Sequence, residues 1–271
     1  MASGSPTTSP EPDLLGARFA TLRAAGRRAL IPYLTAGYPD RSATPGLLDR
    51  LADAGADVIE LGVPFSDPLA DGPTIQRASQ CAIRGGATLA WTIETLAGFR
   101  ARSDTPVVLF TYLNPVVHYG VERFIGDAVA AGAQGVLLTD LPLGADDALE
   151  GAIEASPLAL IRLVAPTTPP ERAREIARRA QGFLYYVSRT GVTGARGSLR
   201  ASLAREVAAL RDVATVPVVV GFGISKPEHA AEIGPHADGI VVGSALIEVL
   251  DRGGADAAAS FLRGLRAALD G

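Results

Sequence analysis

Eight short runs of apolar and β-branched residues alternate with helix-favouring stretches, and this alternation limits the folds open to the chain. The runs are 29–34, 58–61, 106–110, 135–139, 158–164, 182–187, 217–221 and 239–242. Each is almost continuously apolar, which is typical of parallel strands covered on both faces. Eight such strands in about 250 residues predict an α/β fold, a (β/α)8 TIM barrel. A doubly wound open sheet remains the alternative, because periodicity alone does not show closure.

Segments between the runs have the composition of helices. We predict helices at 47–54, 89–100, 170–180, 203–213 and 255–269. A further helix at 14–25 precedes the first strand and is expected to plug the bottom of the barrel. Residues 1–13 are rich in Ser, Thr and Pro, which predicts a disordered tail. The remaining residues, 14–271, are then a single catalytic domain with an extra N-terminal helix.

Composition argues against several functional classes. The net charge is −4 and no basic run occurs, so nucleic acid is not an expected partner. No apolar run has the length of a membrane span, and the N-terminus lacks the apolar core of a signal peptide. Cys81 is the single cysteine, so no intrachain disulfide can form and a reducing compartment is expected. These features predict a cytoplasmic protein acting on a small molecule.

Two carboxyl groups stand out within 58–73, where an apolar run passes into a Pro-rich loop. Alternation along the run puts Val58, Glu60 and Gly62 on one face. If that face lines the barrel interior, burial raises the pKa of Glu60, as an acid–base catalyst requires. The loop then delivers Asp71. The alternatives are a buried Glu60 paired with an arginine, and an Asp71 that only forms a turn before Gly72.

Glycines follow the last three predicted strands at positions suited to phosphate binding. Gly194 follows the sixth strand, Gly223 the seventh, and Gly243 with Ser244 the eighth. Barrels often bind phosphate with these loops and a helix N-terminus. The alternative is that these glycines only form tight turns. The long glycine-rich segment 188–198 is a candidate mobile flap.

Lysine and histidine are scarce, which narrows the chemistry. Lys226 is the one lysine and lies outside every predicted strand, so a Schiff base is improbable. His118, His229 and His236 lack the spacing of metal ligands, so no metal site is expected. If this chain cleaves a carbon–carbon bond, the substrate itself must hold the developing charge. A ring that accepts a proton at carbon and then expels its side chain would do so.

Four segments resemble one family, the tryptophan synthase α subunits, and the likeness extends over the chain from about Leu14 onward. The segments are 32–39, 60–73, 188–194 and 221–225, which read PYLTAGYP, ELGVPFSDPLADGP, SRTGVTG and GFGIS. The resemblance implies a lyase on a (β/α)8 barrel. Its reaction is the retro-aldol cleavage of indole-3-glycerol phosphate to indole and glyceraldehyde 3-phosphate, without metal or imine.

Residue roles also come from the resemblance. Glu60 matches the catalytic proton shuttle, and Asp71 matches the acceptor of the indole N–H. Thr193 matches a flap residue that meets Asp71 on closure, and Tyr185 matches a support of the catalytic Glu. The residues that match the indole pocket are Tyr33, Phe110, Tyr112, Leu137 and Phe222, and those that match phosphate binders are Gly194, Gly223, Gly243 and Ser244. The family often has Phe at the Tyr33 position and Leu at the Phe110 position.

A partner is implied as well, namely the β subunit in an αββα tetramer. Pyridoxal phosphate would belong to that partner, and this chain would hold no cofactor. Pro64, Asp67, Asn114 and Pro142 match positions at or near the interface. The alternatives are a stand-alone indole-releasing lyase, a phosphate-binding barrel such as indole-3-glycerol-phosphate synthase, which needs catalytic lysines, and a non-catalytic scaffold.

Overall fold

The structure, a computed structural model, describes residues 13–187, 196–221 and 223–271, with the backbone alone for 196–202. Most of the predicted tail and residues 188–195 of the predicted flap therefore lie outside the described residues. Asp13, expected in the tail, instead caps the first helix: its Oδ1 accepts the Gly16 N–H at 2.8 Å.

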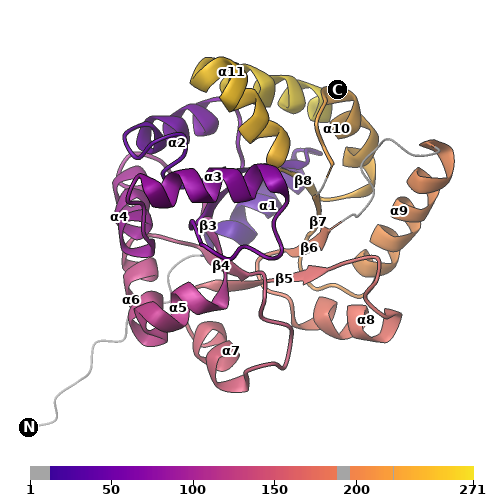
Figure 1. Cartoon of the computed structure of the whole chain (residues 1–271). Helices are drawn as coiled ribbons and strands as arrows, with labels where there is room; N and C mark the ends of the chain where they lie inside the picture. Colours follow the sequence, from indigo (N-terminus) through magenta and orange to yellow (C-terminus); the bar gives the residue numbers. More distant parts are fainter. Residues whose placement is uncertain (1–12, 188–195, 222) are drawn as a thin grey trace, which may run out of the picture.

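Eight parallel strands close into a barrel in sequence order, with β1 paired to β8. Figure 1 shows this ring of strands enclosed by helices. The strands are β1 (Ala29–Thr35), β2 (Ile59–Gly62), β3 (Val107–Thr111), β4 (Gly135–Leu138), β5 (Ala159–Val164), β6 (Leu184–Val187), β7 (Val218–Gly221) and β8 (Gly239–Val242). Closure confirms the TIM barrel and excludes the open sheet.

Helices cover the outside of the barrel, apart from the first helix, α1, which closes one end. They are α1 (Leu14–Ala24), α2 (Ala43–Asp53), α3 (Pro73–Arg84), α4 (Leu89–Arg100), α5 (Leu113–Tyr119), α6 (Val121–Ala130), α7 (Asp147–Glu154), α8 (Pro170–Arg179), α9 (Arg196–Arg211), α10 (Pro227–Ile233) and α11 (Ser244–Asp270), with a short 3-10 helix η1 (Gly234–His236). None of the helices in the described part of the chain is long and apolar enough to cross a membrane.

The barrel interior is a separate apolar cluster that α1 completes. Leu15, Phe19 and Leu22 of α1 share this cluster with inward-facing strand residues such as Val58 and Val108. The rings of Phe19 and Phe183 lie 5.8 Å apart. The predicted N-terminal helix therefore packs into the barrel interior, as expected. Because α1 fills one end, the open end of the barrel is left for the site.

The helix boundaries differ from prediction where glycine or loop composition obscured the pattern. Gly254 (φ +68°) has a non-helical backbone and divides α11 at a kink into two helices, and the second of these confirms the helix predicted at 255–269, whereas the first, from Ser244, was not predicted. The helix predicted at 203–213 begins at Arg196. The short helix α5, which was not predicted, contains His118 in its last turn and is terminated by Gly120 (φ +95°).

Candidate active site

A cavity of about 500 Å3 opens where the strands end at their carboxyl side. Strands, helices and loops from all around the barrel contribute to it, because the parallel strands all point their last residues to this end. Its lining residues are Tyr33, Glu60, Ala70, Asp71, Gly72, Ile75, Phe110, Thr139, Leu163, Tyr185, Val187, Gly223, Ile224, Ser225, His229, Val241, Gly243, Ser244, Ala245 and Glu248.

Glu60 lies on the floor of this cavity. Val58, two residues earlier, belongs to the interior cluster, which confirms the alternation that turns Glu60 inward. Glu60 is 1% exposed, and neither carboxyl oxygen has a hydrogen-bond partner among the described residues. No arginine pairs with it there, so the structural alternative of a buried ion pair is not observed. Burial raises the pKa of Glu60 to about 8.

Asp71 is held at the rim by Tyr112. The Tyr112 hydroxyl accepts the Ala70 N–H at 3.0 Å and hydrogen-bonds to the Asp71 carboxyl group. Burial raises the pKa of Asp71 to about 6, although the hydrogen bond from Tyr112 opposes that shift. Asp71 also has a turn role: its N–H donates to the Pro68 carbonyl at 3.0 Å. The turn therefore presents the carboxyl group to the cavity, and the two readings of Asp71 are compatible.

Two tyrosines flank Glu60, each laid across a strand-end glycine. A methyl group at Gly62 would lie 2.2 Å from the Tyr33 hydroxyl, and one at Gly221 would lie 2.2 Å from the Tyr185 hydroxyl. Only glycine permits these approaches. The pKa of each phenol is raised, chiefly by burial and further by the negative charges of Glu60 and Asp71. Both phenol groups therefore lie within range of the charges of Glu60 and Asp71.

The lining also includes backbone of the segments that follow β7 and β8. Gly223 has a φ of +79° in the loop after β7. Gly243 precedes α11, whose first residue is Ser244 and whose first turn has no side-chain cap. Backbone N–H groups at the start of such a helix lack intrahelical partners and favour an anion. The predicted phosphate end thus lies in the same cavity as the acidic pair.

Most predicted site residues gather in this cavity, but not all of them. Glu60, Asp71, Tyr33, Phe110, Tyr185, Gly223, Gly243 and Ser244 line it. Tyr112 is buried behind Asp71, and Leu137 is fully buried in the interior cluster without lining the cavity. Thr193, Gly194 and Phe222 lie outside the described residues. The edge of the Tyr33 ring faces Phe110, with centroids 5.2 Å apart.

Sequence reasoning missed several lining residues. Thr139 directly follows β4, and Leu163 is the last but one residue of β5. The alternation of inward-facing residues along β5 would have identified Leu163. His229 was assigned no role, yet its side chain lines the cavity and bonds back to Ser225. Its position in the first helical turn after the predicted phosphate-binding segment 221–225 was the available signal.

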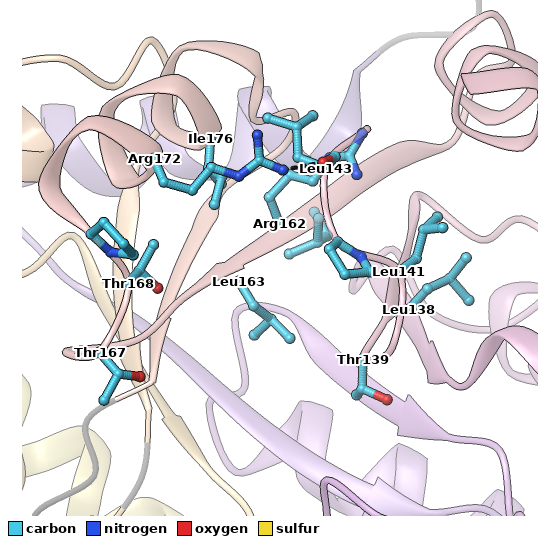
Figure 2. A pocket seen from close by; sticks show the side chains of 13 residues that line it. Leu138, Thr139, Leu141, Leu143, Arg162, Leu163, Thr167, Thr168, Arg172 and Ile176 are labelled. Atoms are coloured by element: carbon cyan, nitrogen blue, oxygen red, sulfur yellow. Dashed lines mark hydrogen bonds between the residues drawn. The ribbon is translucent and has the colours of Figure 1, made fainter. Parts of the chain in front are cut away.

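A second cavity of about 330 Å3 lies beside the first and shares Thr139 and Leu163 with it. Figure 2 shows its lining between the loops that follow β4 and β5, beside α8. Arg162 is buried here, and its Nη2 donates to Glu150 at 2.6 Å and to Glu154 at 2.8 Å. Glu150 in turn accepts three backbone N–H groups of the β4–α7 loop. This network fixes a loop at the open end.

The first cavity combines one acid that keeps its proton at neutral pH with one that loses it. Glu60 and Asp71 have pKa values of about 8 and about 6, so the two carboxyl groups can act as acid and as anion at once. Within the described residues, no group of three or more His, Cys, Asp or Glu side chains could hold a metal ion.

Known proteins match this chain in sequence and in structure over almost its whole length. The family model "Tryptophan synthase alpha chain" matches residues 19–266. The alpha chain from Laribacter hongkongensis is 50% identical over 257 residues, which are 93% of this chain and 97% of that protein. The one from Geobacter sulfurreducens is 50% identical over 234 residues, 86% and 89% of the two chains. A crystal structure of the alpha subunit from Legionella pneumophila superposes with a TM-score of 0.87 at 36% identity, covering 95% of this chain and 98% of that one.

Proposed function

The chain belongs to the tryptophan synthase alpha chain family, whose members cleave indole-3-glycerol phosphate in tryptophan biosynthesis, and we propose that Glu60 and Asp71 carry out this cleavage here. The observation that carries the assignment is the cavity itself. Its lining unites Glu60, which is buried and has no hydrogen-bond partner among the described residues, with Asp71 and with a helix start that has no side-chain cap.

Glu60 moves the protons. In its neutral form it donates a proton to C3 of the indole ring. The resulting carboxylate then takes the proton of the side-chain hydroxyl as the bond between C3 and the adjacent carbon breaks. The electron pair of that bond returns to the ring, which leaves as indole, and the hydroxyl carbon becomes the aldehyde of glyceraldehyde 3-phosphate. Glu60 ends the reaction protonated, ready for a further turnover.

Asp71 stabilises the charge that the ring acquires. Protonation at C3 makes the indole nitrogen cationic, so the ring serves as its own electron sink. The Asp71 carboxylate accepts the indole N–H, and this hydrogen bond strengthens as the positive charge develops. Tyr112 orients Asp71, because its hydroxyl bonds to the carboxyl group and to the neighbouring Ala70 N–H.

The remaining proposed contacts divide between the ring and the phosphate. Tyr33, Phe110, Tyr185 and Phe222 would surround the ring, with Tyr112 bonded to Asp71 and Leu137 in the interior cluster without direct contact with the ring. Gly194, Gly223, Gly243 and Ser244 would hold the phosphate through backbone N–H groups, as helix and loop N–H groups do elsewhere. Thr193 would meet Asp71 on closure of the flap. We assign no resident cofactor to this chain.

Two substitutions test the assignment. Glu60→Gln removes the proton shuttle and should abolish release of indole from indole-3-glycerol phosphate. Asp71→Asn should lower kcat by about 10²- to 10³-fold, as loss of one charge-stabilising group does in other enzymes. Glu94→Gln, on the exposed face of α4, is the matched control. Circular dichroism checks that each variant is folded. Near-normal turnover by folded Glu60→Gln would refute the mechanism.

Family membership implies a β-subunit partner. We propose an αββα tetramer in the cytoplasm, with pyridoxal phosphate held by the partner. Pro64, Asp67, Asn114 and Pro142 are the proposed contacts. Asp67, Asn114 and Pro142 are exposed, on loops or helix starts that follow β2, β3 and β4. That position supports an interface at the same end of the barrel as the cavity.

A further inference from the structure

We propose that the imidazole of His229 is a side-chain ligand of the substrate's phosphate group. The inference rests on the proposed function, since it concerns the phosphate end of the same cavity. It adds a charged or hydrogen-bonding side chain to a cradle otherwise made of backbone.

The charge balance of the cavity first draws attention to His229. Three carboxyl groups line the cavity, those of Glu60, Asp71 and Glu248. His229 is the one basic side chain in the described part of the lining. A phosphate group carries close to two negative charges at neutral pH. A cavity with this lining therefore offers the phosphate backbone N–H groups, hydroxyl groups and, among the described residues, a single side chain able to carry positive charge.

Hydrogen bonding orients the His229 ring. The Ser225 N–H points at Nδ1 over 3.3 Å, and the Ser225 hydroxyl lies 3.5 Å from the same nitrogen. A backbone N–H can only donate, so Nδ1 is the acceptor. In the neutral ring the proton then resides on Nε2. No hydrogen bond occupies Nε2 within the residues that the structure describes. The ring is thus held by one nitrogen and has a free N–H donor on the other.

Ser225 joins this arrangement to the phosphate loop. It follows Gly223 and Ile224 after β7, and all three line the cavity, as do Gly243, Ser244 and Ala245 at the start of α11. Glu248, one turn further along α11, is engaged by Thr74 and by Arg252, at 3.3 and 3.4 Å. Because Thr74 and Arg252 bind the Glu248 carboxylate, this carboxylate does not pair with His229, and the imidazole can contact the anion.

A purely structural role for His229 is the competing explanation. In that case the ring only supports the Ser225 loop through Nδ1, and Nε2 has no function. The two explanations assign importance to different nitrogens, and amide substitutions separate them. Asn can present an acceptor near the Nδ1 position, whereas Gln reaches the Nε2 position with an N–H donor.

Binding is tested without turnover by nuclear magnetic resonance of the imidazole groups. The chain has three histidines, so His118, His229 and His236 give a simple long-range proton–nitrogen spectrum. The His229 signal is assigned by its loss in His229→Gln. Titration with glycerol 3-phosphate should shift the Nε2 signal of His229 and leave those of exposed His118 and His236 unmoved. An unmoved His229 signal at saturating glycerol 3-phosphate overturns the proposal.

Kinetics give the second test. His229→Leu and His229→Asn should each raise KM for indole-3-glycerol phosphate about tenfold, the scale of a hydrogen bond to a charged group, with a much smaller change in kcat. His229→Gln should restore KM to near the parent value. His236→Leu, on exposed η1, is the control. Rescue by Asn in place of Gln would show that Nδ1 matters and would overturn the proposal.

The two tests separate this inference from the proposed reaction. If the chain cleaves the substrate but His229 fails both tests, only the inference falls. If the chain releases no indole while glycerol 3-phosphate still shifts the His229 signal, the reaction assignment falls and the anion site stands.

Discussion

Glu60 has an unusual environment for a carboxyl group, since it is buried without a hydrogen-bond partner in the described structure. Such burial is costly for the ionised form and explains the pKa of about 8. Asp71, partly buried and bonded by Tyr112, has a pKa of about 6. In the mechanism that we propose, the active form has Glu60 protonated and Asp71 ionised, and this form predominates between these two values.

A bell-shaped pH profile follows from that pair. We expect kcat/KM for the isolated chain to rise through about pH 6 and to fall through about pH 8. The second ionisation of the substrate's phosphate also lies near pH 6, so the falling limb is the diagnostic one. A profile that stays flat from pH 7 to 10 would contradict the assignment of Glu60 as the initial acid.

Burial of Glu60 should also cost stability at high pH. The unfolded chain loses this proton near pH 4.5, whereas the folded chain keeps it to about pH 8. Stability of the parent therefore declines as pH rises between these values, by up to roughly 5 kcal/mol. Glu60→Gln has no proton to lose. The melting temperature of the variant relative to that of the parent should therefore rise from pH 5 to pH 9. If the two melting temperatures change in parallel with pH, the inference is contradicted.

Among the elements, the β4–α7 loop depends on one buried ion pair. The side chains of Arg162 and Glu150 are 3% and 1% exposed, and Glu150 binds three loop N–H groups. Arg162→Ala would leave Glu150 buried without its cation, and we expect a loss of about 3–5 kcal/mol in the free energy of unfolding.

The matched control is Arg174→Ala, which breaks the exposed pair with Glu171 and should cost about 0–1 kcal/mol. Urea denaturation measures both variants. Equal effects from the two substitutions would show that the buried network adds nothing beyond a surface pair.

Elements differ in how well the sequence alone predicted them. The strands were predictable because their apolar runs end at polar or glycine residues, and β8 matches its predicted range throughout. Short helices such as α5 and α10 were harder, since seven residues offer too few turns for periodicity. The acidic pair could be anticipated from 58–73. His229 was harder to anticipate, because its one signal was a place in the first turn after the segment 221–225, and the sequence does not show which residues of that turn face a cavity.

For the whole molecule, the open end of the barrel carries both the cavity and the proposed partner contacts. We expect the isolated chain to turn over slowly and to accelerate by roughly 5- to 150-fold with a β subunit, the usual range of coupling between sites. The measurement is indole release at rising β-subunit concentration. A rate independent of the partner would support a stand-alone lyase instead.

The contact between Tyr33 and Gly62 restricts how the ring-binding side of the cavity can diversify. With Tyr33 present, any larger residue at position 62 collides with the phenol. A smaller residue at position 33 would release that restriction but leave a void beside Glu60. Positions 33 and 62 are thus expected to covary across homologues and in directed evolution. A library that randomises only one of these positions would consist mostly of variants with a steric clash or a void beside Glu60.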